Sequence, residues 1–225
     1  MMRFLALSAF LLLAATGAAA AADCDRDPAP GIDWSGCDKE RLILNDENLE
    51  GAKLTGTLLS GTGFEGANLR GAILDLAEIN RVSFKKANLA NSSMEKTSGS
   101  KVDFEGADLT GARLSKIDLS RSVFFGAKLN DADLSKGEFN RCDFQDADLS
   151  GANLKLGSLA RSGLMGTKLA GADFTDAYLF RTIITGADLS SVKGLQQDQL
   201  DAACGDHATK LPAGLKPSPR WPCEE

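Results

Sequence analysis

A line of basic residues with a fixed spacing is the feature of this sequence best suited to binding chemistry. A Lys or Arg recurs every 20 positions at Arg81, Lys101, Arg121, Arg141, Arg161 and Arg181. If the chain returns to the same place every 20 residues, these six cations line up and form a strip for a polyanion or an acidic partner.

Mutual neutralisation is the alternative interpretation of this line, and it is the one we favour from the sequence. Acidic residues lie two or three positions from its members, at Glu78, Asp103, Asp118, Glu138 and Asp143. Residues 41–192 hold 18 basic and 20 acidic residues, so their charges nearly balance. Exposed pairs of this kind contribute little to stability and need no partner.

The sequence offers little material for catalysis. It contains one His, His207, and one Tyr, although histidine is the side chain that most often moves protons in enzymes. His207 has no evident nucleophile beside it, and neither CxxC nor HxxxH spacing occurs. We therefore expect a protein that is not an enzyme and that holds no metal or cofactor.

The elements that would align the cations follow from a five-residue period. From Leu44 to Leu189 every fifth residue is large and apolar, and Gly99 is the one exception among 30 positions. The residue two positions earlier is usually small, and residues two apart on a strand point to the same side. Each unit therefore predicts one short wall with two inward side chains, followed by a corner at glycines such as Gly51 and Gly106.

A superperiod of 20 residues sets the number of walls. Core phenylalanines recur at that spacing, at Phe64, Phe84, Phe104, Phe124 and Phe144. Four walls then make one coil, and coils stack about 4.8 Å apart through strand-type hydrogen bonds. Residues 44–189 predict about seven coils. The missing core residue at Gly99 predicts a small cavity or a bulged loop.

The two ends of the chain differ from the repeats. Residues 1–22 are typical of a secretory signal peptide, because Arg3 precedes an uncharged apolar run and small residues precede Asp23. The apolar run is too short to span a membrane, and no later stretch could do so. We therefore expect a periplasmic or secreted protein. The segments that follow are an N-terminal cap (23–40), a solenoid (41–192) and a C-terminal cap or tail (193–225) with a short helix near 196–203.

Five cysteines in an exported chain favour disulfides. Cys142 occupies a small inward position of the repeat, so we expect a buried free thiol. The other four allow three pairings, of which we favour the local one, Cys24 with Cys37 and Cys204 with Cys223. Each bond would then fasten one cap.

The motifs GANL (66–69 and 151–154), GADL (106–109 and 186–189) and GARL (111–114) closely resemble the pentapeptide-repeat family. The resemblance implies an all-β protein, a right-handed quadrilateral β-solenoid, but no single activity. It also implies a possible homodimer through the open ends of the solenoid, unless disulfide-fastened caps block them.

Two functions are compatible with this organisation. The first is a non-catalytic exported scaffold that binds a protein or an anionic surface polymer. The second is a DNA-mimicking modulator of a type II topoisomerase, a role that some members of the family have. The signal peptide and the near-neutral repeat region disfavour the second function, and nucleic acid is not expected as a partner.

Overall fold

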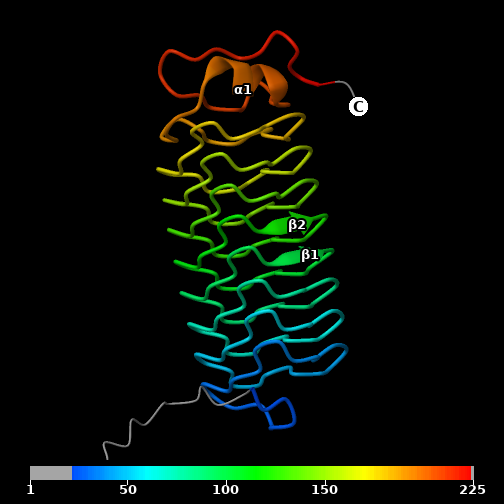
Figure 1. Cartoon of the computed structure of the whole chain (residues 1–225). Coiled ribbons are helices and arrows are strands. Elements are labelled where there is room, and N and C mark those ends of the chain that lie inside the picture. Colours follow the sequence, from blue (N-terminus) through cyan, green and yellow to red (C-terminus); the bar gives the residue numbers. More distant parts are fainter. Residues whose placement is uncertain (1–21, 224–225) are drawn as a thin grey trace, which may run out of the picture.

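The chain winds into a rod of stacked four-sided rungs, each of 20 residues (Figure 1). This computed structural model describes residues 22–223, so the predicted signal peptide lies, except for Ala22, outside the described residues. Four columns of parallel bridges mark the four sides of the rod, and they join residues 20 apart except at the C-terminal end, where Ile183 pairs with Cys204 and Asp188 with Lys210. We number the sides by the first bridge of each column: Asp33 to Lys53 (first), Asp38 to Leu58 (second), Ile43 to Gly63 (third) and Asn48 to Asn68 (fourth).

Backbone hydrogen bonds tie every rung to its neighbours. Lys53 N–H donates to the Ile32 carbonyl of the preceding rung (2.8 Å), and Leu54 N–H donates to the Ile73 carbonyl of the following rung (2.7 Å). Among the described residues, two walls extend far enough to form strands, β1 (Ser98–Ser100) and β2 (Asp118–Ser120), which pair in parallel with Ser98 opposite Asp118. The walls elsewhere contribute one bridge per rung and then turn.

The predicted file of phenylalanines is confirmed. Ring centroids of consecutive members from Phe64 to Phe144 lie 5.3, 5.1, 4.8 and 4.6 Å apart, and the rings are tilted by 12° or less. Leucines fill a parallel file behind the fourth side, where Leu89, Leu109 and Leu129 are fully buried. The period of 20 residues therefore governs the core as well as the backbone.

Small polar residues at inward positions add a second set of bonds between rungs. Thr97 Oγ1 donates to the Leu74 carbonyl (2.7 Å) and Thr182 Oγ1 to the Leu159 carbonyl (2.7 Å). Cys142 lies in such a position, with its Sγ 3.1 Å from the Leu119 carbonyl oxygen. It is a buried free thiol, as predicted. Burial raises the pKa of this thiol to about 12, so it acts as a small core residue.

The predicted defect at Gly99 is absent. Gly99 lies in the middle of β1, which keeps its register with β2, so the loop is not bulged. A Cβ added at Gly99 would lie 2.7 Å from Cγ1 of Ile79 in the preceding rung. Ile79 thus occupies the space in which a cavity was expected, and the prediction is wrong on this point.

The solenoid begins earlier than the five-residue period predicts. The bridge column of the first side starts inside the segment 23–40 and runs through Asp33, Lys53, Ile73, Ser93, Arg113, Asp133, Asn153, Asp173 and Lys193. Eight bridges join these nine residues, so this side runs through eight coils, whereas the sequence from Leu44 predicted about seven. The period is lost before Leu44 because Lys39 stands where it requires an apolar residue, whereas Trp34 and Cys37 already point inward and are buried.

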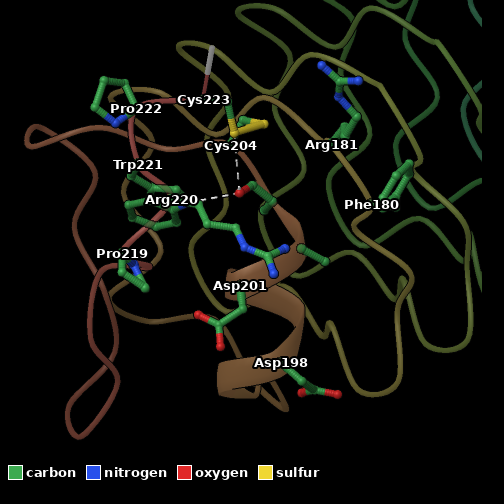
Figure 2. Close-up of a pocket in the computed structure, with 12 residues that line it drawn as sticks. Phe180, Arg181, Asp198, Asp201, Cys204, Pro219, Arg220, Trp221, Pro222 and Cys223 are labelled. Atoms are coloured by element: carbon green, nitrogen blue, oxygen red, sulfur yellow. Dashed lines mark hydrogen bonds between the residues drawn. A yellow bond between two sulfur atoms is a disulfide. The ribbon is translucent and has the colours of Figure 1, made fainter.

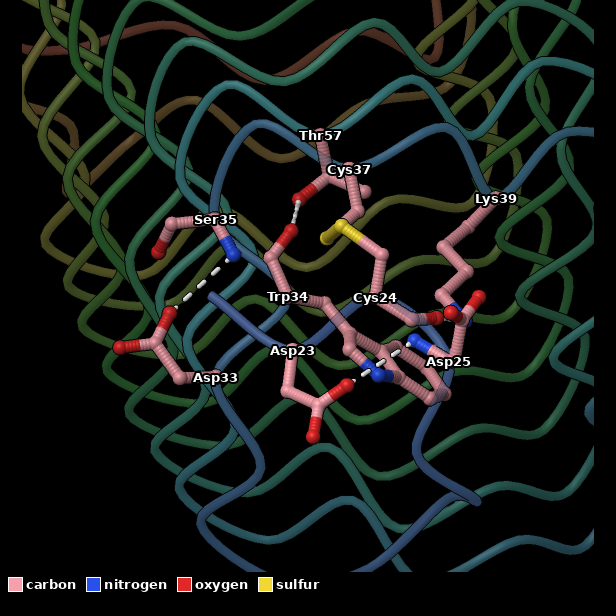
Figure 3. The surroundings of a disulfide bond; sticks show 9 residues. All are labelled: Asp23, Cys24, Asp25, Asp33, Trp34, Ser35, Cys37, Lys39 and Thr57. Carbon is pink, nitrogen blue, oxygen red and sulfur yellow. Dashed lines mark hydrogen bonds between the residues drawn. A yellow bond between two sulfur atoms is a disulfide. The ribbon is translucent and has the colours of Figure 1, made fainter. Parts of the chain in front are cut away.

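The N-terminal end of the rod is covered by a short disulfide-bonded loop (Figure 3). Cys24 is bonded to Cys37. The Lys39 ammonium lies 4.1 Å from the centroid of the Trp34 ring and donates a hydrogen bond to the Cys24 carbonyl. This loop places Trp34 as the first member of a core file.

The C-terminal end is covered by α1 (Gln197–Ala202), which lies across the last rungs beneath the tail (Figure 1). Gln199 Nε2 donates to the carbonyls of Phe174 (2.9 Å) and Ala177 (2.7 Å), which satisfies groups at the open end of the ladder. Cys204 is bonded to Cys223. Within residues 22–223 no helix has the length and apolar character that crossing a membrane requires.

A buried hydroxyl offers a test of the core. Ser92 Oγ is buried without a hydrogen-bond partner among the described residues, while Ala72 and Ala112 fill the same position on adjacent rungs. Ser92→Ala should raise the free energy of unfolding by about 1 kcal/mol, because an unsatisfied hydroxyl is removed from the interior. The urea midpoint measures this.

Ser162→Ala is the matched control, because the Ser162 hydroxyl donates to the Phe139 carbonyl. That substitution should lower the midpoint. If Ser92→Ala also lowers the urea midpoint, the Ser92 hydroxyl must form a stabilising hydrogen bond that is not seen in the structure, and the prediction is wrong.

Candidate anion-binding edge

The structure brings the six spaced cations together on one corner of the rod, between the second and third sides. We call this row the basic edge: Arg81, Lys101, Arg121, Arg141, Arg161 and Arg181. Every member is exposed. Each backbone N–H donates to a carbonyl of the next rung, as Arg121 does to Asn140 (3.0 Å) and Arg141 to Ala160 (2.9 Å). Neighbouring members are therefore one rung, about 4.8 Å, apart along the rod.

All six residues of the basic edge have left-handed backbone conformations, with φ between 53° and 61°. Such a conformation costs a residue with a Cβ about 1–2 kcal/mol, whereas glycine adopts it freely. The next corner along the chain uses glycine at five rungs: Gly66, Gly106, Gly126, Gly166 and Gly186. The basic edge thus keeps long cationic side chains where glycine would suit the backbone better.

No member of the basic edge forms an ion pair with any residue in the range 22–223. Asp103, one of the acids expected to neutralise the row, pairs instead with Lys85 (3.3 Å). Our preferred interpretation from the sequence, neutralisation by these nearby acids, is therefore wrong at the level of direct contacts. Like charges at this spacing repel one another, so the row stores unfavourable energy in the absence of a partner.

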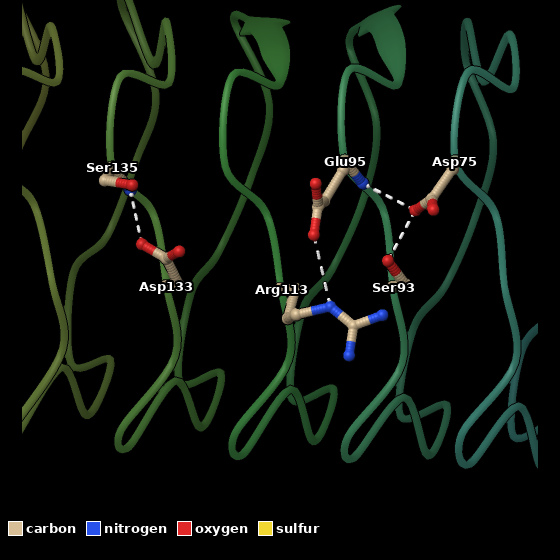
Figure 4. Close-up of polar contacts among 6 residues, drawn as sticks. All are labelled: Asp75, Ser93, Glu95, Arg113, Asp133 and Ser135. Carbon is tan, nitrogen blue, oxygen red and sulfur yellow. Dashed lines mark hydrogen bonds and ion pairs between the residues drawn. The ribbon is translucent and has the colours of Figure 1, made fainter.

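Charges on the first and fourth sides behave differently, because they pair from rung to rung. On the first side, Arg113 Nε donates to Glu95 Oε1 at 3.2 Å (Figure 4). On the fourth side, the ammonium of Lys128 lies 3.6 Å from Asp108, and that of Lys168 lies 3.5 Å from Asp148. Pairing between rungs thus neutralises charge on the first and fourth sides, and no such pairing occurs along the basic edge among the described residues.

A second, shorter row of cations was not identified from the sequence. Lys96, Lys116 and Lys136 share the left-handed conformation (φ 57–58°) at the corner between the first and second sides. They too form no ion pair with another described residue. Their 20-residue spacing was a signal that could have revealed them. Around β1 and β2 the second side is therefore bordered by cations on both corners.

Hollows lie beside the C-terminal end of the basic edge. The larger, about 790 Å³, lies between the last rung, α1 and the tail, and is lined by Phe180, Arg181, Arg220 and Trp221 among others (Figure 2). Trp221 Nε1 donates to the Ala203 carbonyl (2.8 Å), which holds the tail against α1. A second hollow of about 690 Å³ includes Arg161 and Arg181. The tail residues have no period, so sequence spacing gave no signal for them.

The cations of these features offer positive charge to an anion. His207 is exposed in the tail and lines neither of these two hollows. Among residues 22–223, no group of three or more His, Cys, Asp or Glu side chains is arranged to hold a metal ion.

Comparisons with known proteins agree with the coiled architecture. The family model described as pentapeptide repeats matches in eight copies, over residues 48–85, 77–115, 103–141, 117–155 and 164–193. No curated protein sequence matches the chain.

Solved structures with a similar fold include trypsin-treated QnrB1, described as a plasmid-mediated fluoroquinolone resistance protein. It has a TM-score of 0.65 at 17% identity over 81% of this chain and 88% of that one. Full-length QnrB1 has a TM-score of 0.56 at 16% identity over 80% of this chain and 91% of that one. HetL from the cyanobacterium Nostoc sp. strain PCC 7120 has a TM-score of 0.40 at 22% identity over 78% of this chain and 90% of that one.

The strain in the basic edge predicts an unusual mutational result. Arg141→Gly should raise the free energy of unfolding by about 1 kcal/mol, because glycine relieves both the left-handed strain and the repulsion by Arg121 and Arg161. Thermal and urea midpoints should both rise.

Arg113→Gly is the control, since Arg113 is extended and exposed on the first side. Glycine there should lower stability by about 0.5–1 kcal/mol. If Arg141→Gly destabilises the protein as much as Arg113→Gly does, the basic edge supports the fold and is not a strained surface.

Proposed function

The chain belongs to the pentapeptide-repeat family, and we propose that it is a non-catalytic binding scaffold that acts outside the cytoplasm and recognises an acidic protein along its basic edge. Members of the family fold as right-handed quadrilateral β-helices, in agreement with the four bridge columns of this chain. They are generally structural or binding proteins, and no enzyme family is indicated for this one.

The observation that carries the proposal is the length of the row: six exposed cations on consecutive rungs, without an ion pair among the described residues, against three in the row of Lys96, Lys116 and Lys136. Six exposed cations adopt a conformation that favours glycine. None of them has an acidic contact among the described residues, although cations on the first and fourth sides do. Departures from local rules without a compensating gain in the fold are typical of functional surfaces. An acidic partner would remove the repulsion within the row and so bind it selectively.

Export is supported by two features of the chain. The predicted signal peptide at residues 1–22 would direct it out of the cytoplasm. The disulfides Cys24–Cys37 and Cys204–Cys223 cover opposite ends of the rod, and such bonds persist in oxidising compartments. We place the protein in the periplasm or among secreted proteins.

The topoisomerase alternative has one observation in its favour, the likeness of fold to a fluoroquinolone resistance protein. A DNA mimic presents an acidic rod, whereas this rod carries an uncompensated row of cations. An anionic surface polymer is the other candidate partner, because a row of cations attracts any polyanion. Both alternatives are outcomes of the experiment that follows.

The proposed function can be tested by using the protein as bait to capture partners from the envelope fraction of the host, and by asking whether capture requires the basic edge. The baits are residues 23–225, the edge variant Arg121→Gln/Arg141→Gln/Arg161→Gln, and the control Lys53→Gln/Lys128→Gln/Lys168→Gln. The control removes the same charge from paired positions on the first and fourth sides. We expect an acidic protein to be retained by the unsubstituted chain and the control, and its retention to fall about tenfold or more with the edge variant.

Equal retention by the edge variant would contradict the role of the basic edge. Captured material that resists protease and consists of polysaccharide would replace the protein partner by a polymer. Inhibition or protection of a type II topoisomerase in a supercoiling assay would favour the alternative function.

A further inference from the structure

Exposed apolar side chains flank the basic edge only over its C-terminal half. On the second side, Tyr178 and Phe180 are 56% and 41% exposed, and their stacked rings lie 6.1 Å apart. On the third side, Ile183 is 41% exposed, and Phe125 and Met165, each 40% exposed, lie at the far margin of that side, beside the corner that contains Gly126 and Gly166. We call these five residues, together with Arg121, Arg141, Arg161 and Arg181, the docking strip.

The N-terminal half of the basic edge lacks such flanks. Beside Arg81 and Lys101, the outward residues next to the corner on the second side are Asn80 and Ser100, and those of the third side are Ser83 and Asp103. Apolar neighbours are concentrated beside Arg161 and Arg181, whereas Arg121 and Arg141 also lie near the carboxylates of Asp118, Glu138 and Asp143. A polyanion attracted by charge alone would make no distinction between these halves, whereas an amphipathic partner would.

Hollows beside the docking strip are lined in part by apolar side chains. One of about 370 Å³ is lined by Arg141, Ala160, Arg161, Tyr178 and Phe180, among others. The hollow of about 690 Å³ lies on the other side of the row, with Ile183 and Pro222 beside Arg161 and Arg181. The strip thus offers a central line of positive charge with apolar recesses on both flanks.

We propose that the docking strip binds an acidic amphipathic α-helix of the partner, laid along the rod axis. This inference rests on the proposed function, because it specifies the element of the acidic protein that the basic edge recognises. The acidic face of the helix would lie over the arginines, and its apolar residues would contact Tyr178 and Phe180 on one flank and Met165 and Ile183 on the other.

The spacing of the arginines favours a helix over an extended segment. Arg121 and Arg181 are three rungs apart, or about 14 Å along the rod. Carboxylates at i, i+4, i+7 and i+11 of a helix span about 16 Å, which flexible Arg side chains can match. Four acidic residues on one face of an extended strand span about 20 Å.

The flanks distinguish the two conformations further. A helix places residues on both sides of its acidic row, so that apolar groups can reach both flanks of the strip at once. A strand with its acidic face on the arginines points the residues between them away from the rod. Asp198 and Asp201 of α1 line the hollow beyond Phe180 and Arg181 (Figure 2). The acidic row of the helix should therefore end before α1.

Binding of synthetic helices, measured by fluorescence anisotropy on residues 23–225, tests the inference. The probe is a covalently stapled helix with Glu at i, i+4, i+7 and i+11 and Leu on both flanks of that row. One control peptide redistributes the same residues around the helix, and another alternates Glu and Leu in a strand-forming sequence. We expect the probe to bind about tenfold more tightly than either control.

Protein variants locate the site on the rod. Arg141→Gln/Arg161→Gln should weaken probe binding about tenfold, while the matched double variant Lys128→Gln/Lys168→Gln should leave it unchanged. Tyr178→Ser/Phe180→Ser should also weaken it severalfold, because the apolar flank is lost. Circular dichroism and urea midpoints establish that each variant is folded.

The inference is overturned if the redistributed or strand-forming peptide binds as tightly as the probe, or if the arginine variant binds the probe unchanged. If capture of an acidic protein still depends on the basic edge in that case, the proposed function stands and the helix alone is excluded. A polyuronate that binds more tightly than every peptide, with the same dependence on Arg141 and Arg161, overturns both.

Discussion

The register between rungs is the constraint on which the rest of this structure depends. Backbone N–H and carbonyl groups bond to the preceding and following rungs, so a residue and its equivalent 20 positions later are held one above the other. Inside the rod this register stacks the rings from Phe64 to Phe144. Outside, it turns a 20-residue spacing of Arg and Lys into a continuous row of charge. The core and the candidate site are therefore two results of one geometric rule.

The same rule explains why the sides and the corners of the rod differ electrostatically. On the fourth side, outward residues face equivalents of opposite sign, as Lys128 faces Asp108. The corner row from Arg81 to Arg181 repeats one sign on every rung, so the register places like charges beside one another. Left-handed backbone conformations add strain at the same residues. The function that we propose accordingly depends on a pattern of charge and apolar contact along one edge of the scaffold.

Periodicity made most of this fold predictable from sequence. The inward file of Phe and Leu, the four sides and the buried Cys142 all followed from position in the repeat. Prediction failed where a single residue departed from the period. Lys39 interrupts the apolar period, so the first rung was not predicted. Gly99 suggested a cavity, but Ile79 occupies that space.

The candidate site was only half predictable. The row of cations was evident from spacing, but pairing depends on the reach and direction of side chains between rungs, which spacing does not specify. Asp103 therefore looked like a counter-ion of Lys101 and instead contacts Lys85. The hollow that Arg220 and Trp221 line depends on how the tail packs on α1. The tail has no repeat, so the spacing of its residues could not predict this hollow.

Native-state hydrogen exchange, resolved by residue, tests the register most directly. Phe124 N–H donates to the Asp143 carbonyl and Leu129 N–H to the Asp148 carbonyl of the next rung, both at 2.7 Å, whereas the N–H groups of Phe125 and Asn130 donate to no backbone carbonyl among the described residues. Slow exchange should therefore recur with a five-residue period through the repeats, with Phe124 and Leu129 protected and Phe125 and Asn130 exchanging much faster. Equal exchange at these four amides, or protection without that period, would contradict the stacked-rung account.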